Sequence, residues 1–225
     1  MKQKLLLALL IVTIHTTANA QNIRLNAYSS YVFDDRVDSY YDNTNYYEGQ
    51  IKGGLLFGAG VEFMIHPSQG FELIYLRQST TAPMKYYSNG IKNTVFDLGV
   101  NYIMIASNRY FRQSGSKVEG YGGAMIGADI LSLKDPTNSN STTKTKLAWG
   151  IRGGMNYWVS DNIGIKLQAQ LLSAVQSVGG GFYFGTGGSG AGLSSYSSMY
   201  QFGLGGGLTF KMGGAKKKYK FKSKK

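Results

Sequence analysis

The stretch IGIKLQAQLLSAV, residues 163–175, decides the fold class, because its apolar and polar residues alternate. Ile163, Ile165 and Leu167 share one face of an extended chain, while Lys166 and Gln168 share the other. A period of two residues predicts a β-strand with one apolar face. The run exceeds the ~5–6 residues of an average soluble strand and suits a tilted strand that crosses a bilayer, which needs ~9–11 residues.

Seven further runs show similar alternation, so the sequence predicts eight strands in all. Polar segments rich in Gly, Asn, Asp or Pro separate the runs. The run at 71–81 alternates least well. The predicted strands cover 22–33, 51–65, 71–81, 94–106, 117–131, 145–159, 163–175 and 199–211.

The predicted connections alternate between long and short. HPSQG (66–70) and VSDN (159–162) are tight, and NRYFRQSGSK (108–117) is intermediate. Long loops at one end and short periplasmic turns at the other are typical of outer-membrane barrels. We therefore expect an all-β fold, an eight-stranded antiparallel transmembrane β-barrel of up-and-down topology with both termini in the periplasm. The long, polar connections lie at about 34–47, 82–93, 132–144 and 176–198.

The first twenty residues, MKQKLLLALLIVTIHTTANA, have the features of a secretory signal peptide. Lys2 and Lys4 precede an apolar run, and Ala18 and Ala20 form an Ala-x-Ala cleavage motif. The run is too short to span a bilayer as a helix. We expect a signal peptide at 1–20, an outer-membrane barrel at 21–212 and a Lys-rich periplasmic tail at 213–225, in the outer membrane of a Gram-negative bacterium.

The formal net charge of +12 is concentrated at the chain ends. Removing Lys2 and Lys4 leaves +10, and the seven lysines of the last ten residues leave +3 for residues 21–215. We therefore expect no nucleic-acid partner. The tail is either a solvated end or a contact site for anionic lipid headgroups or an acidic envelope protein. Its candidate contact residues are Lys216, Lys217, Lys218, Lys220 and Lys222.

If the apolar faces contact lipid, the opposite faces point into the barrel. The interior of an eight-stranded barrel is just wide enough for side chains, and buried charges there must pair. We expect a structural ion-pair network, with a transport or catalytic site as the alternative. Its charged members are Arg24, Lys52, Glu62, Asp97, Glu119, Asp129, Arg152 and Lys166. Other residues of the same faces are Asn26, Glu72, Asn101, Asn156, Gln168, Gln170 and Gln201.

Enzymatic and nucleotide-binding functions lack necessary parts. Gly185, Gly187 and Gly190 form a G-x-G-x-x-G, but an alternating run follows instead of a helix, so we expect a glycine-rich surface loop. His66 is the one His after the predicted signal peptide, and it stands beside Pro67 in a short turn. With no Cys as well, the chain has no plausible transition-metal site. We expect a non-enzymatic protein without a cofactor.

The segment SDNIGIKLQAQLL (160–172) and the last predicted strand, MYQFGLGGGLTF (199–210), carry a family likeness. Over residues 21–212 the chain resembles the small outer-membrane β-barrel proteins of the OmpW, OmpX and PorT-like kind, especially those of the Bacteroidetes. The resemblance implies contact with outer-membrane lipid and lipopolysaccharide, and it implies that the barrel-assembly machinery reads Phe210. In the family this aromatic ends the chain, whereas fifteen residues follow Phe210.

The resemblance implies no single activity. The leading hypothesis is a barrel for envelope integrity or surface interaction, with a lumen filled by paired charges. One alternative is a narrow channel for small or apolar solutes. Another is an accessory subunit of an outer-membrane secretion or assembly complex, in which the tail would dock on a partner. A lipid-A-modifying enzyme is disfavoured by the scarcity of His.

Overall fold

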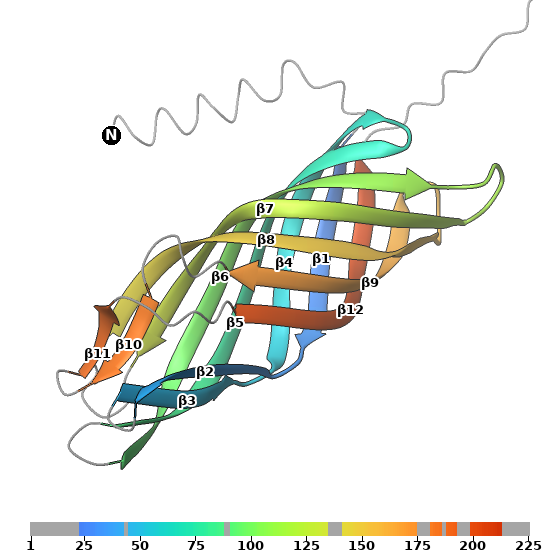
Figure 1. Ribbon diagram of the computed structural model, residues 1–225. Coiled ribbons are helices and arrows are strands. Elements are labelled where there is room, and N and C mark those ends of the chain that lie inside the picture. The colour runs from blue at the N-terminus through green and yellow to red at the C-terminus, as the bar shows by residue number, and fades with distance from the viewer. Residues whose placement is uncertain are drawn as a thin grey trace, which may run out of the picture.

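A computed structural model describes residues 23–42, 45–87, 91–134, 141–174, 181–185, 188–192 and 199–212. It is a closed antiparallel β-barrel of eight strands, so the predicted fold class is confirmed (Figure 1). The sheet closes where β1 pairs with β12 on one side and with β4 on the other. No helix among these residues is long and apolar enough to cross a membrane. The barrel strands are β1 (Ile23–Val32), β4 (Gly54–His66), β5 (Gln69–Tyr87), β6 (Ile91–Phe111), β7 (Val118–Lys134), β8 (Ser141–Trp158), β9 (Ile163–Ala174) and β12 (Met199–Met212).

The strands are paired with a stagger that tilts them across the barrel wall, as Figure 1 shows. Following the register partners once around the barrel from Trp158 on β8 leads back to Ala148, ten residues earlier on the same strand. The partners, in order, are Gly164, Thr209, Asn26, Gly60, Ile74, Met104 and Gly127. Strand number and stagger together fix the tilt, ~35–45° in closed barrels, and the diameter. With eight strands the interior has room for side chains only.

The outer surface of the barrel is apolar, as the alternation predicts. Every barrel strand exposes large hydrophobic side chains there, for example Leu25, Phe57, Leu73, Ile105, Ile126, Ile151, Leu167 and Leu204. Exposed aromatic residues near the strand ends include Phe33, Phe63, Phe71, Tyr157 and Tyr200. Trp158, next to Tyr157 at the end of β8, is 3% exposed and faces the lumen instead.

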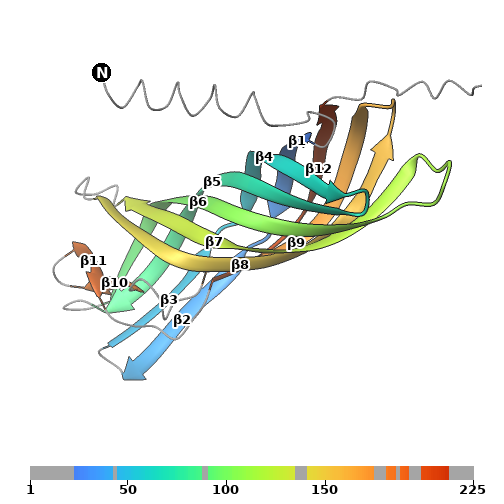
Figure 2. The same cartoon turned by 90° about the horizontal axis from the view of Figure 1, so that it is seen from above.

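Four adjacent strands protrude at the end opposite the short turns (Figures 1 and 2). β5, β6, β7 and β8 have 19, 21, 17 and 18 residues, whereas β1, β4, β9 and β12 have 10, 13, 12 and 14. Much of the expected loops at 82–93 and 132–144 is therefore strand. The protruding part has an apolar inner face that gives these strands a core, formed by Ala82, Met84, Phe96, Leu98, Leu131 and Leu133.

Two further hairpins occupy segments expected to be loops. β2 (Asp35–Asp42) pairs with β3 (Asn45–Ile51), and β3 also pairs with the protruding part of β5. β10 (Gly181–Gly185) pairs with β11 (Gly188–Gly192). Gly185 and Gly190 of the G-x-G-x-x-G therefore lie in a β-hairpin that contacts β8 and β5 at the extended end (Figure 1), whereas Gly187 lies outside the described residues.

Gly60 tests how tightly the interior is filled. A Cβ at this inward position would overlap the Glu72 carboxylate. We expect Gly60→Ala to lower the free energy of unfolding by ~1–3 kcal/mol, because the carboxylate must leave its partners. Urea unfolding in detergent micelles measures the change. The neighbouring Ala59→Val, on the exposed outer face, is the matched control. Equal losses in both variants would contradict tight filling at Gly60.

Candidate functional site

The half of the interior nearest the short turns holds two facing carboxylates. Glu62 on β4 and Glu72 on β5 are register partners, and they are 0% and 1% exposed. Like charges in such positions repel one another. Other strands must therefore supply donors and a counter-charge.

Arg152 on β8 supplies that counter-charge by reaching across the lumen. Its Nη2 forms an ion pair with the Glu72 carboxylate. Two donors from β1 complete the shell of Glu72, since Asn26 Nδ2 lies 2.8 Å and Tyr28 Oη 2.5 Å from Oε1. Arg152 Nη1 also donates to Tyr28 Oη at 3.1 Å. Strands far apart in the wall are thus joined through one carboxylate.

Asn108 on β6 links the two carboxylates. Its Nδ2 donates to Glu62 Oε1 at 2.7 Å and to Glu72 Oε2 at 3.2 Å. Its Oδ1 accepts from Arg152 Nη2 at 3.0 Å. Tyr110 Oη donates to Glu62 Oε1 at 2.7 Å. Because each carboxylate receives several donors, the repulsion between them is offset within the network.

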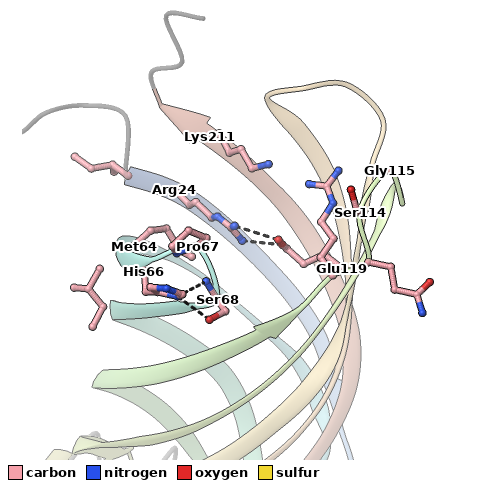
Figure 3. Close-up of a pocket in the computed structure, with 13 residues that line it drawn as sticks. Arg24, Met64, His66, Pro67, Ser68, Ser114, Gly115, Glu119 and Lys211 are labelled. Carbon is pink, nitrogen blue, oxygen red and sulfur yellow. Dashed lines mark hydrogen bonds and ion pairs between the residues drawn. The ribbon is translucent and has the colours of Figure 1, made fainter. Parts of the chain in front are cut away.

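A second ion pair crosses the lumen next to the short turns. Arg24 on β1 donates from Nη1 and Nη2 to the Glu119 carboxylate on β7, at 2.8 and 3.2 Å (Figure 3). Asn156 Nδ2 donates to the same carboxylate at 3.0 Å. Lys166, 1% exposed, places its Nζ 4.2 Å from the centroid of the Tyr121 ring. Bidentate geometry and neighbouring aromatic rings favour Arg24 in this buried position.

Six of the eight predicted network charges lie inside the barrel: Arg24, Glu62, Glu119, Asp129, Arg152 and Lys166. Asp129 is separate from the ion pairs described above. It lies farther toward the extended end, where it is the register partner of Lys146.

Lys52 and Asp97 lie outside the network, which corrects the prediction for both. β4 begins at Gly54, so Lys52 precedes the barrel wall and instead pairs with Asp34 at 3.2 Å. Asp97 is exposed because its neighbours on β6, Phe96 and Leu98, face inward. Alternation separates the two faces of a strand, but it does not show where the strand enters the barrel wall or which of the two faces points into the lumen.

Sequence reasoning missed the aromatic members of the interior and its apolar layer. Tyr28 has the same parity on β1 as Arg24, so the alternation itself could have placed it inside. Above the ion pairs, toward the extended end, the interior is closed by apolar side chains that are buried to at least 97%. These include Val32, Leu56, Ile74, Leu76, Met104 and Leu172. The interior therefore has a charged half and a mainly apolar half, in which Gln201 bonds to Gln78 and Tyr102.

The junction between the barrel and the β2–β3 hairpin depends on two adjacent carboxyls. Gly53 N–H donates to Asp34 Oδ1 at 2.6 Å, and this bond together with Lys52 holds the pKa of Asp34 below its usual value. Tyr200 N–H donates to Asp35 Oδ2 at 2.8 Å, whereas burial raises the pKa of Asp35. The hairpin base is thereby tied to the turn before β4 and to the start of β12.

Phe210 lies on β12 between its register partners Leu25 and Ile163 and is half-buried. Its part in assembly stays a prediction. The predicted signal peptide at 1–20 lies outside the described residues, and so do the tail lysines Lys216, Lys217, Lys218, Lys220 and Lys222.

Removal of Glu72 should be costly because it leaves the Arg152 charge buried without its counter-ion. We expect Glu72→Gln to lower the free energy of unfolding by ~3–5 kcal/mol, and Glu72→Leu combined with Arg152→Met to cost less. Urea unfolding of the refolded barrel measures both. The exposed Asp97→Asn is the control and should change stability by no more than ~0.5 kcal/mol. A double variant as unstable as the single one would show that pairing is not what the carboxylate provides.

Asp34 should make the hairpin junction sensitive to acid. The pKa of Asp34 in the folded protein lies below the usual value of ~3.9. The hydrogen bond from Gly53 therefore stabilises the junction fully above that usual value, and this stabilisation is lost as the pH falls through the lowered pKa. The Gly53 amide resonance in NMR spectra should therefore titrate with a midpoint below ~3.9. Asp34→Asn should abolish this titration, and Asp161→Asn, in the turn at the opposite end, should leave it unchanged. A midpoint at or above the usual value would disprove the assignment.

Comparisons with known proteins place the fold but no sequence family. No family model and no curated protein matches the chain. The chain is similar to the solved structure of Neisserial surface protein A (NspA), with 14% identity over 84% of this chain and 97% of that one and a TM-score of 0.52. It is also similar to the outer membrane protein OprG from Pseudomonas aeruginosa, with 9% identity, coverages of 86% and 97% and a TM-score of 0.55. The expected likeness to small outer-membrane barrels therefore holds for the fold.

Proposed function

We propose that the protein is a non-enzymatic outer-membrane barrel that serves envelope integrity or surface interaction. The short turns and both chain termini would face the periplasm, and the protruding sheet would stand at the cell surface. The apolar outer surface supports a membrane location, because closed barrels satisfy every backbone group in lipid. The fold shared with NspA and OprG supports the same location.

The observation that carries the proposal is that the lumen contains two barriers in series. The Arg24–Glu119 and Arg152–Glu72 pairs cross its periplasmic half. Beyond them, buried apolar residues such as Leu56 and Met104 fill the section. A hydrated ion would have to separate a buried ion pair and then cross a mainly apolar layer whose buried amides, Gln78 and Gln201, already bond to each other. This arrangement favours a scaffold over a channel.

The protruding sheet is the part of the barrel best placed to meet a partner. A hollow of about 620 Å³ lies where the β2–β3 hairpin joins β5 and β6. Arg36 and Lys85 line it together with the polar Gln50 and Asn93, and none of the lining residues that the structure describes is acidic. Strands rather than loops carry these groups, so they are held in fixed positions. Such a surface suits an anionic group of an external ligand.

Planar-bilayer recording tests the closed lumen. We expect the full-length protein to insert without producing a stable conductance. Arg24→Ala combined with Glu119→Ala should also stay silent, because the Arg152–Glu72 pair and the apolar layer remain. Insertion is verified by heat-modified migration of protein recovered from the bilayer lipid, with a porin as the positive control. A steady conductance in the wild type would overturn the scaffold proposal and favour the narrow channel.

A further inference from the structure

The lumen opens at the short-turn end into a cavity of about 660 Å³, which we call the vestibule (Figure 3). Its size falls within the ~300–1,000 Å³ of small-ligand sites. Arg24 and Glu119 form its inner end, and Lys211 lies above them on β12. Arg112 and His66 come from the two turns at its rim.

The vestibule has more positive than negative charge. Glu119 is its one carboxylate among the described lining residues, and Arg24 and Asn156 already engage it. Arg112 and Lys211 form no ion pair with any residue that the structure describes. Arg112 Nε donates to Ser116 O at 2.8 Å, and Lys211 Nζ lies 3.5 Å from the centroid of the Trp158 ring. Two cations therefore border the cavity without a contacting counter-charge.

One wall of the vestibule is apolar. It is formed by Ile23, Met64 and Ile65. Ile65 is 63% exposed and lies at a β-bulge of β4, where Met64 pairs with Gly70 and His66 with Gln69. Preceding odd-numbered residues of β4, such as Phe63, belong to the apolar outer surface. The cavity thus joins a cationic lumen mouth to the surface that would contact lipid.

We propose that the vestibule binds the phosphate group of an anionic phospholipid from the inner leaflet of the outer membrane. Lys211 and Arg112 would hold the phosphate, and Ile23 and Ile65 would contact the glycerol and the upper acyl chain. Free phosphate has the same anionic chemistry but makes no apolar contact. A peptide acid would gain nothing from the lipid-facing Ile65. The inference rests on the proposed function, since it requires the short turns to lie at the periplasmic leaflet.

Trp158 provides a reporter within the contact range of the site. The chain has two Trp, and Trp149 lies on the outer surface, so Trp149→Phe leaves Trp158 as the single tryptophan. Full-length protein in phosphatidylcholine bicelles is titrated with phosphatidylglycerol. We expect a saturable change in Trp158 emission, because the phosphate would pair with the Lys211 ammonium group that lies over the ring. No response to phosphatidylglycerol, or an equal response to added phosphatidylcholine, would overturn the proposal.

Two variants distinguish lipid binding at the vestibule from general electrostatic attraction between the lipid and the protein. Arg112→Gln leaves the Lys211–Trp158 contact in place and should weaken the apparent affinity by at least ~10-fold. Lys117→Gln, in the same turn but outside the cavity lining, should have little effect. All variants keep the Lys-rich tail, and heat-modified migration checks that each is folded. Equal losses for Arg112→Gln and Lys117→Gln would show only diffuse attraction and would overturn the site.

Two further experiments show whether the bound phosphate belongs to a lipid or is free in solution. Inorganic phosphate should produce a much weaker response than phosphatidylglycerol, and Ile65→Ser should weaken the lipid response alone. Equal responses to the two ligands would overturn the lipid assignment. Binding in bicelles does not depend on orientation in the cell. Labelling of a Cys introduced at Ser114 in intact cells would reveal a surface-exposed turn, so failure of the proposed orientation is distinguishable from failure of the site.

Discussion

Closure of the sheet between β1 and β12 is the constraint on which the rest of the structure depends. In lipid every backbone donor and acceptor needs a partner, and a closed barrel has no unpaired edge. Eight strands with a ten-residue stagger then leave an interior that only side chains can fill. Charges that enter it must be neutralised there. This explains why the Glu72 carboxylate has partners on β1, β6 and β8 rather than on neighbouring strands alone.

The two halves of the interior contribute differently to the barrel. The charged half is directional, because Glu62, Glu72 and Asn108 accept and donate only in particular geometries. A one-residue slip of β5 would turn Glu72 toward the apolar surface, so this half specifies the strand register. The mainly apolar half excludes water by close packing, and within it Gln201 bonds to Gln78 and Tyr102. The combination gives a barrel that is both uniquely paired and closed along its axis.

The sequence was informative where one face differs in polarity from the other. The alternation at 163–172 predicted β9 and its inward residues Lys166 and Gln168. β5 alternated poorly because it crosses both halves of the interior and carries Glu72 and Ile74 on the same face. The β2–β3 hairpin lies in a segment expected to be a loop, and its pairing with β5 is a tertiary contact with no local signature. Lys52 and Asp97 were misplaced because alternation alone does not define where a wall begins.

The two strands that close the barrel, β1 and β12, are held in place by different contacts. β1 is attached across the lumen by side chains, through Arg24 to Glu119 and through Asn26 and Tyr28 to Glu72. In the same half, the inner face of β12 carries Gly205 and Gly207, which have no side chains to insert. In this half β12 therefore joins β1 mainly through backbone hydrogen bonds, whereas nearer the extended end its Gln201 donates across the lumen to Gln78. β1 is thus held through the lumen, and β12 mainly along the wall.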